Sequence, residues 1–139
     1  MTRVASLGIA LTCCLTVSAL AQSASEPASG IEWLGFEEGV RVASETKTAV
    51  LVDIYAPWCG WCTRLQTDVY TDRRVQDYLR DNFTVTRLNI DAVDDAVTFR
   101  GYEVTSAELA MGLGASGTPT TVFLDPSGNY ITRLPGFVA

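Results

Sequence analysis

The sequence feature that most constrains the fold is an apolar run, Ala49–Tyr55, followed closely by the string Trp58-Cys59-Gly60-Trp61-Cys62. The run is rich in β-branched residues and has the length of a strand, so it predicts a strand buried on both faces of a sheet. Pro57 ends the run, and from Cys59 onward apolar side chains recur at the three- and four-residue spacing of a helix. The two cysteines are therefore expected at a strand-to-helix junction.

The rest of the sequence alternates helical and strand patterns, each bounded by its own capping or turn residues. The expected helices lie at 37–44, after the N-cap Asp72, and after the capping box Thr105–Glu108. The expected strands lie at 83–90, 120–124 and 130–134, with a small inserted hairpin at 98–104. Strands that alternate with helices and close in a hairpin indicate an α/β sandwich around a mixed sheet.

Composition removes several classes of function. The chain has 139 residues, the usual size of one domain. It has no histidine, so a Ser-His-Asp triad, a Cys-His dyad and imidazole metal ligands are excluded. Sixteen acidic and ten basic side chains give a net charge of −6, and Lys47 is the only lysine. Neither nucleic acid nor an anionic membrane is therefore expected as the main partner.

The first 21 residues have the pattern of an export signal. Arg3 is followed by the uncharged, mostly apolar stretch Val4–Leu20, and Ala19-Leu20-Ala21 forms a small-x-small cleavage site. An uncleaved membrane anchor is the alternative, and both interpretations place the domain outside the cytoplasm, in a periplasm. The predicted organisation is a signal peptide over 1–21, a flexible polar leader over 22–30 and one folded domain over 31–139.

Cleavage would leave Cys59 and Cys62 as the two cysteines of the mature chain. When the first cysteine of such a pair opens a helix, free backbone N–H groups and the helix dipole stabilise its thiolate. Cys59 is thus the expected nucleophile, and Cys62, one turn further, is placed to resolve a mixed disulfide. Zinc would need two more nitrogen or sulfur ligands, and a structural disulfide across so short a loop would stabilise little. Redox chemistry is expected, and no metal site is.

Two further features lie near this pair in the expected fold. Asp53 interrupts the otherwise apolar strand, so it either faces solvent at a sheet edge or is a buried acid with a raised pKa. In the second case it could exchange a proton with Cys62. Gly117-Thr118-Pro119 lies just before an expected strand. Proteins retain cis prolines in tight turns at functional positions, so a cis Thr118–Pro119 bond is one interpretation of this segment.

The order VDxYAxWCxxC, a strand, a helix, and GTPT followed by FLDPSG resembles the thioredoxin superfamily across residues 31–138. The resemblance implies a thioredoxin-like three-layer sandwich with a central mixed sheet flanked by helices. It implies that Cys59 attacks, that Cys62 resolves and that Asp53 is the buried acid. It also implies that Pro119 is the cis proline beside the disulfide, and that the backbone of Thr118 pairs with a bound substrate.

The aromatic residue flanking the motif, Trp58, matches the superfamily as well. Together with Gly60 and Trp61 it completes the expected substrate-binding residues. Within the superfamily the chain is similar to exported, SoxW-like thioredoxins and to the C-terminal domain of the DsbD transmembrane reductase. The similar segments are Asp72–Val75, Thr105–Ala110 and Arg133–Phe137.

Two departures from that pattern matter. Trp61 replaces the proline of cytoplasmic thioredoxin, so the redox potential cannot be copied from that protein. The sequence also stops at Ala139, where the relatives continue into a last helix over one sheet face. The C-terminal helix is therefore expected to be missing, either through truncation or because a partner covers that face.

The resulting hypothesis is a periplasmic thiol–disulfide oxidoreductase that mainly reduces protein disulfides. The pair Gly60-Trp61 lacks the histidine that oxidising relatives use to stabilise the reduced thiolate. A monomer is expected, with no cofactor beyond the Cys59–Cys62 disulfide and with a membrane electron donor of the DsbD type. A disulfide oxidase or isomerase is one alternative. Another is a copper(I)-binding module, for which Met111 would be the available extra soft ligand.

Overall fold

A computed structural model describes residues 30–92 and 96–139. The predicted signal peptide, and the predicted leader apart from Gly30, lie outside the described residues. Within those two ranges, no helix has the length and apolar character needed to cross a membrane.

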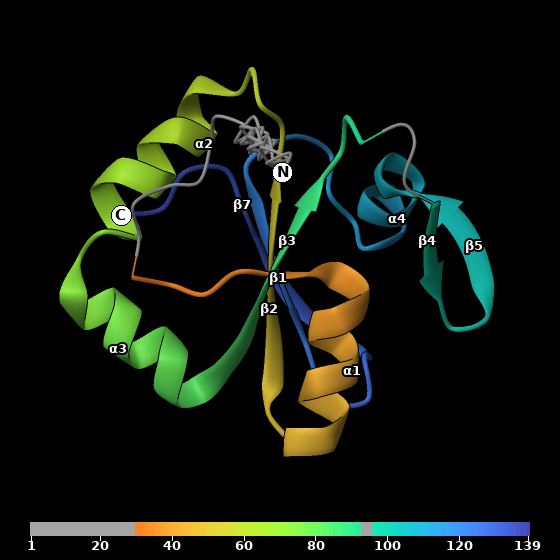
Figure 1. Cartoon of the computed structure of the whole chain (residues 1–139). Helices are drawn as coiled ribbons and strands as arrows, with labels where there is room; N and C mark the ends of the chain where they lie inside the picture. The colour runs from red at the N-terminus through yellow and green to blue at the C-terminus, as the bar shows by residue number, and fades with distance from the viewer. Residues whose placement is uncertain (1–29, 93–95) are drawn as a thin grey trace, which may run out of the picture.

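A five-stranded mixed sheet forms the centre of the domain, in the order β1-β3-β2-β6-β7 (Figure 1). Its strands are β1 (Leu34–Gly35), β2 (Ala49–Tyr55), β3 (Phe83–Asn89), β6 (Thr120–Leu124) and β7 (Tyr130–Pro135). The middle strand β2 has the bounds that the sequence predicts. It pairs in parallel with β3 and antiparallel with β6, while β6 and β7 form the predicted hairpin. The two-residue strand β1 was not predicted.

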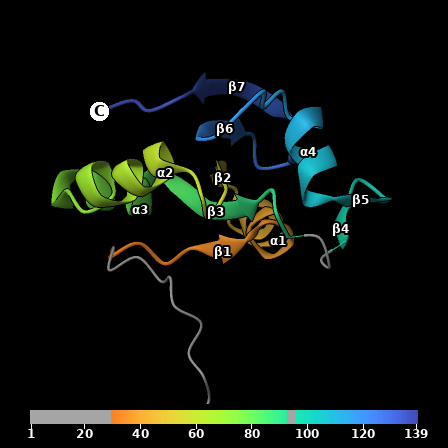
Figure 2. The same cartoon turned by 90° about the horizontal axis from the view of Figure 1, so that it is seen from above.

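Helices cover both faces of this sheet. The helices are α1 (Phe36–Thr46), α2 (Gly60–Arg64), α3 (Arg73–Asn82) and α4 (Ser106–Gly112), with a π-helical turn, η1 (Leu65–Val69), continuing α2. Figure 2 shows α1 and α4 on one side of the strands, and α2 and α3 on the other. The predicted three-layer thioredoxin-like sandwich is confirmed.

The helix starts follow the predicted capping residues. The carboxylate of Asp72 accepts a hydrogen bond from the backbone N–H of Arg74 at the start of α3. At the start of α4, Thr105 and Glu108 form a complete capping box. Each cap satisfies backbone donors that the first helical turn leaves unpaired, so these two boundaries were readable from the sequence.

The inserted hairpin is formed by β4 (Ala96–Phe99) and β5 (Tyr102–Thr105). Gly101 lies in its tight turn with φ of +82°, a conformation that glycine adopts without strain. Hydrogen bonds from both of its strands and its turn, among other contacts, hold the hairpin to the domain. The carboxylate of Glu37 accepts from the backbone N–H of Thr98, and Arg100 donates to the carbonyl of Gly128 at 3.2 Å.

The side chains buried against the sheet form two hydrophobic cores. The core under α1 and α4 contains Phe36, Ala43, Val50, Val52, Ile54, Leu88, Val97, Leu109, Ala110, Leu113, Val122 and Leu124. The core on the α2 and α3 side is smaller and contains Leu51, Leu65, Tyr70, Leu79 and Val85. The sheet is thus buried on both faces, as the apolar run at β2 predicted.

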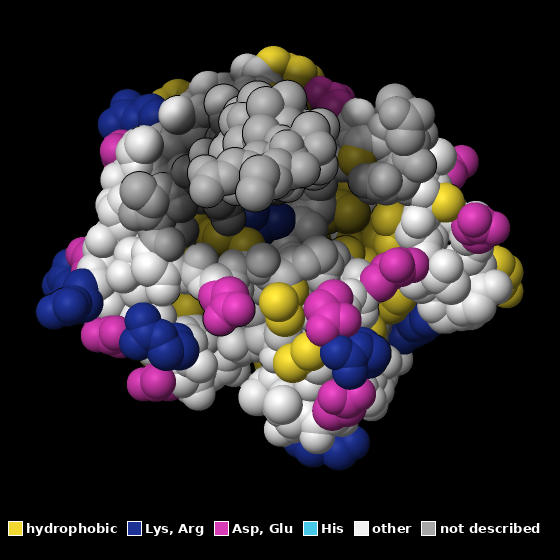
Figure 3. All heavy atoms as spheres, viewed as in Figure 1, with side chains coloured by type: hydrophobic (Ala, Val, Ile, Leu, Met, Phe, Trp, Pro, Cys, Tyr) yellow, Lys and Arg dark blue, Asp and Glu magenta, His cyan; other side chains and the backbone are white. Residues whose placement is uncertain are grey.

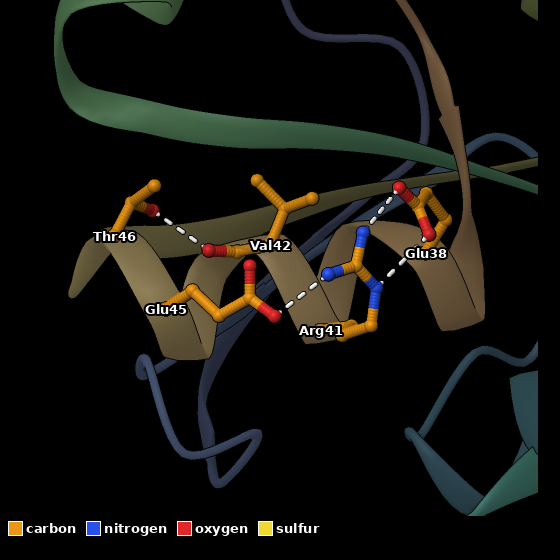
Figure 4. Close-up of polar contacts among 5 residues, drawn as sticks. All are labelled: Glu38, Arg41, Val42, Glu45 and Thr46. Atoms are coloured by element: carbon orange, nitrogen blue, oxygen red, sulfur yellow. Dashed lines mark hydrogen bonds and ion pairs between the residues drawn. The ribbon is translucent and has the colours of Figure 1, made fainter.

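The outer surface carries mixed charges. On the described part of the face in Figure 3, acidic and basic side chains are interspersed. Figure 4 shows one such group on α1, where Arg41 lies between Glu38 and Glu45 at 2.6 and 2.7 Å. Ion pairs this exposed contribute little to stability, so the fold depends on the two cores.

The strand β7 differs from the others because all six of its residues are exposed. Among the described residues no helix follows β7; the chain from 136 to 139 has no regular structure. On α3, the apolar side chain of Leu79 is buried, whereas the neighbouring Tyr78 is exposed.

Candidate active site

The two cysteines of the motif form a disulfide at the carboxyl end of β2. The S–S distance between Cys59 and Cys62 is 2.13 Å and their Cα atoms are 5.2 Å apart. Cys59 is the N-cap of α2, and its Sγ accepts a hydrogen bond from the backbone N–H of Cys62 at 3.1 Å. A donor at this place favours negative charge on the sulfur, which is what an attacking thiolate needs.

Burial does not distinguish the two sulfurs. Cys59 is 5% exposed and Cys62 is 4% exposed, and both pack against Ala56. Exposed fractions in the oxidised form therefore do not tell which of the two sulfurs attacks. What separates the two residues is position, because the N-cap belongs to Cys59.

Two tryptophans border the disulfide and are strongly exposed. Trp58 is 71% exposed, and its indole N–H donates to a carboxylate oxygen of Asp91 at 2.6 Å. Trp61 is 57% exposed and lies 5.6 Å from the ring of Phe137, while the guanidinium of Arg64 lies 5.7 Å from the Trp61 ring. Asp91 and Phe137 were missed by sequence reasoning as partners of the tryptophans, since they come from distant parts of the chain.

The loop before β6 reaches the same end of the sheet. Ile54 pairs with Thr120, so the preceding Thr118 and Pro119 lie beside the carboxyl end of β2. The Thr118–Pro119 peptide bond is cis, and the Pro119 carbonyl accepts from the backbone N–H of Gly136 at 2.8 Å. Pro119 is buried and Thr118 is half-buried. The fold thus brings the expected substrate-binding loop to the edge that carries the disulfide.

An apolar cavity of about 510 Å³ adjoins this loop. It is lined by Ile54, Ile90, Ala110, Met111, Gly117 and Thr118, among other residues. Ile90 also packs against the cluster formed by Ala56 and the two cysteines, so the cavity is continuous with the surroundings of the disulfide.

Asp53 is the buried acid of the site. It is 1% exposed, so the alternative of a solvent-facing edge residue is wrong. One of its oxygens, Oδ2, accepts from Arg87 Nε and from Gln66 Nε2, each at 3.1 Å. Burial raises the pKa of Asp53 above its ordinary value, while Arg87, Tyr70 and Gln66 act in the opposite direction.

Arg87 is the cation that faces this acid, and sequence reasoning missed it. Its register partner on β2 is Asp53, and its side chain is 14% exposed. The guanidinium lies 3.8 Å from the ring of Tyr55 and 5.4 Å from the ring of Trp33. The signal in the sequence was an arginine inside a strand pattern, but only the pairing of β2 with β3 shows what it faces.

Across the described ranges, no group of three or more histidine, cysteine, aspartate or glutamate side chains could hold a metal ion. The site therefore consists of a disulfide, two exposed tryptophans, a proline loop and a buried acid with its partners.

Comparison with known proteins agrees with this description. A family model described as thioredoxin-like matches residues 32–126. The thiol:disulfide interchange protein DsbD of Ralstonia nicotianae is 33% identical over 102 residues, 73% of this chain and 15% of that protein. DsbD of Yersinia enterocolitica is 34% identical over 91 residues, 64% of this chain and 14% of that protein. The chain therefore spans only about a seventh of these relatives.

Two solved structures are similar over most of their length. A thioredoxin from Thermus thermophilus is 28% identical with a TM-score of 0.60, covering 76% of this chain and 75% of that one. A putative disulphide-isomerase from Bacteroides thetaiotaomicron is 29% identical with a TM-score of 0.61, covering 81% and 85%. These relatives support a thiol–disulfide oxidoreductase. The family match, the fold and the disulfide at the helix start together show that the chain belongs to the thioredoxin-like family.

Proposed function

We propose that the protein is an exported thiol–disulfide oxidoreductase that reduces the disulfides of other proteins. The observation that carries this proposal is the Cys59–Cys62 disulfide, with Cys59 at the N-cap of α2 and a backbone N–H aimed at its sulfur. Export to a periplasm rests on the signal-like pattern of residues 1–21.

The reaction is a two-step exchange between thiols and disulfides. The Cys59 thiolate attacks one sulfur of the substrate disulfide, forming a mixed disulfide and releasing the other substrate sulfur as a thiolate. The Cys62 thiol then loses its proton and attacks Cys59 Sγ, which closes the Cys59–Cys62 disulfide and releases the second substrate thiolate. Two electrons pass to the substrate, and its two thiolates take up two protons.

Asp53 serves as the proton acceptor for Cys62 in the second step. A carboxyl group with a raised pKa binds a proton more readily than an exposed aspartate, so it can take the thiol proton and later return it. Asp53 reaches the helix of the cysteines through Gln66, which lies four residues, or about one turn, after Cys62.

The expected substrate-binding residues surround the disulfide. Trp58, Gly60 and Trp61 present an exposed surface on one side, and the Thr118–Pro119 loop lies on the other. An extended segment of the substrate would pair with the backbone at Thr118 and place an apolar side chain in the adjoining cavity. Fixed aromatic side chains suit this task because they bury a large area with little loss of conformational freedom.

The groups beside Cys59 support the proposed reductive direction. Gly60 and Trp61 bring no charge that would hold the reduced thiolate strongly, which favours a reductant over an oxidant. A reductant in an oxidising compartment needs an electron donor, and similarity to DsbD favours a donor of that class. The proposed protein acts as a monomer and needs no cofactor besides its disulfide.

Insulin reduction with dithiothreitol as the final reductant tests the proposal. The mature chain should catalyse insulin precipitation, Cys59→Ser should abolish catalysis, and Cys62→Ser should trap a mixed disulfide. Thr132→Ser, a serine substitution on the exposed strand β7, is the matched control and should leave the rate unchanged. Equal rates for Cys59→Ser and the control would refute the redox function.

The reduction potential of the Cys59–Cys62 pair separates reductase from oxidase. A reductase should have a potential near that of thioredoxin, about −270 mV, whereas the oxidase DsbA lies near about −120 mV. A value near the oxidase would refute the reductive direction while leaving thiol–disulfide exchange in place.

A further inference from the structure

The helix that carries the cysteines changes its geometry directly after them. Residues Leu65–Val69 form a π-helical turn, closed by a hydrogen bond from Tyr70 N to the carbonyl of Leu65 at 3.0 Å. Such turns are rare and are found mainly at functional sites. Here the turn carries Gln66, whose amide Nε2 donates to Asp53 Oδ2 at 3.1 Å. The irregular turn therefore bears a residue that contacts the buried acid.

Two buried acceptors of this pair lie outside hydrogen-bond geometry with any donor, Asp53 Oδ1 and Gln66 Oε1. The hydroxyl of Tyr70 is near enough to Asp53 to lower the pKa of the carboxyl, but it makes no well-formed hydrogen bond with Oδ1. Leaving a buried acceptor unpaired is costly, so such a group calls for an explanation. A single proton on the carboxyl of Asp53 would supply a donor for one of these acceptors.

We propose that Gln66 is a positioning residue that pairs with Asp53 in both of its protonation states. When Asp53 is a carboxylate, Gln66 Nε2 donates to it, as in the structure. When Asp53 has taken the proton of Cys62, the amide turns by half a rotation and Gln66 Oε1 accepts from the new O–H. This proposal rests on the proposed function, in which Asp53 receives that proton.

The amide suits this role because it carries a donor and an acceptor at similar positions. The other groups facing Asp53 differ from it. Arg87 on β3 has only donors and favours the carboxylate. The hydroxyl of Tyr70 lies between Asp53 and Thr121 of β6, and burial raises the pKa of Tyr70, so it stays protonated. Gln66 offers an acceptor for the acid form, opposite to the effect of Arg87.

The side-chain amide signals of Gln66, followed by NMR in the reduced full-length mature chain, test this proposal. As the pH falls and Asp53 gains its proton, the Gln66 Nε2–H signals should move from hydrogen-bonded to free positions. The midpoint of this change should equal that of the Asp53 carboxyl carbon, and it should lie above the ordinary aspartate value. Signals that stay in place while Asp53 titrates would overturn the proposal, as would an Asp53 that titrates at or below the ordinary aspartate value.

Kinetics of the Gln66→Met variant give a second readout. Removing both amide groups should slow closure of the Cys59–Cys62 disulfide from a mixed disulfide by about tenfold, the effect of one hydrogen bond of ordinary net strength. KM for the substrate should not change. Gln76→Met is the matched control, since Gln76 donates to the carbonyl of Tyr70 at 2.8 Å and not to Asp53. Equal slowing in both variants, or none in either, would contradict the proposal.

The NMR test and the insulin assay fail separately. If Cys59→Ser keeps its activity, the proposed function is wrong whatever the Gln66 signals do. If the insulin assay behaves as expected and the Gln66 signals do not follow Asp53, the reductase stands and the role of Gln66 is refuted.

Discussion

The two faces of strand β2 differ sharply in character. Val50, Val52 and Ile54 point into the core under α1 and α4, and each is fully buried among apolar neighbours. The alternate residues point to the opposite face, where Leu51 lies in the smaller core and Asp53 carries a buried carboxyl. One strand thus has one apolar face in the larger core and another face that carries the buried acid of the site.

This difference shows where the fold buries a charged pair, Asp53 and Arg87, that an apolar core would not contain. Burying an ion pair costs desolvation that the attraction between the charges barely returns. An apolar pair at Asp53 and Arg87 would stabilise the domain as well or better, so stability does not explain these residues. Asp53 contacts Arg87 and also Gln66, which belongs to the π-helical turn after the cysteines. The proposed proton transfer to Asp53 accounts for this arrangement.

The largest expected effect comes from the apolar face. Leu124→Ala should lower the free energy of unfolding by about 2–5 kcal/mol, because it leaves a new cavity in the core under α1 and α4, where Leu124 is fully buried. Denaturant unfolding measures the loss. The pH dependence of the loss should be flat, since no titrating group is removed. A marked pH dependence would show that the two faces are not separate.

On the other face, the substitution Asp53→Asn is expected to raise the free energy of unfolding, by a smaller amount. The raised pKa of Asp53 means that the folded chain keeps its proton where the unfolded chain has released it. As pH rises from the ordinary aspartate pKa to the raised one, the free energy of unfolding falls by about 1.4 kcal/mol per pH unit. Asp53→Asn removes this loss, so its stability advantage over wild type should grow with pH across that window.

The same variant should be a poorer enzyme. Without a proton acceptor for Cys62, closure of the disulfide should slow by about a hundredfold near pH 7. Thermal unfolding at a series of pH values and stopped-flow kinetics measure the two effects. An Asp53→Asn chain whose advantage shrinks as pH rises would contradict the raised pKa, and one with normal kinetics would remove Asp53 from the mechanism.

The smallest effect is expected at a helix start on the apolar side. Thr105→Ala removes the side-chain cap of α4 and should cost about 1 kcal/mol of unfolding free energy. The rate of insulin reduction should not change, because Thr105 touches neither the disulfide nor Asp53 and its partners. A loss of activity larger than the loss of stability would show that the start of α4 itself takes part in the chemistry.

Local signals made much of this molecule readable from its sequence. The bounds of β2, the caps at Asp72 and Thr105 and the hairpin turn at Gly101 depend on residues close in the chain, and the structure has them as expected. The position of the cysteine pair follows from the same local patterns.

The partners of the site residues could not be predicted in this way. Arg87 lies opposite Asp53 because of the register between β2 and β3. Gln66 contacts Asp53 from a π-helical turn, and the residue spacing in the sequence does not predict such a turn. Asp91 and Phe137 reach the tryptophans from distant segments. Burial of Asp53 was an open alternative because a lone acid in an apolar run fits both an edge strand and a central one.

The central claim is that Cys59 attacks and Cys62 resolves, although the two sulfurs are equally buried in the disulfide form. Alkylation of the reduced chain by iodoacetamide across a range of pH, with each cysteine quantified by mass spectrometry, tests it most directly. We expect modification at Cys59 first, with an apparent pKa below the ordinary thiol value of about 8.5, and little at Cys62. Faster modification of Cys62, or an unshifted pKa at Cys59, would contradict the claim.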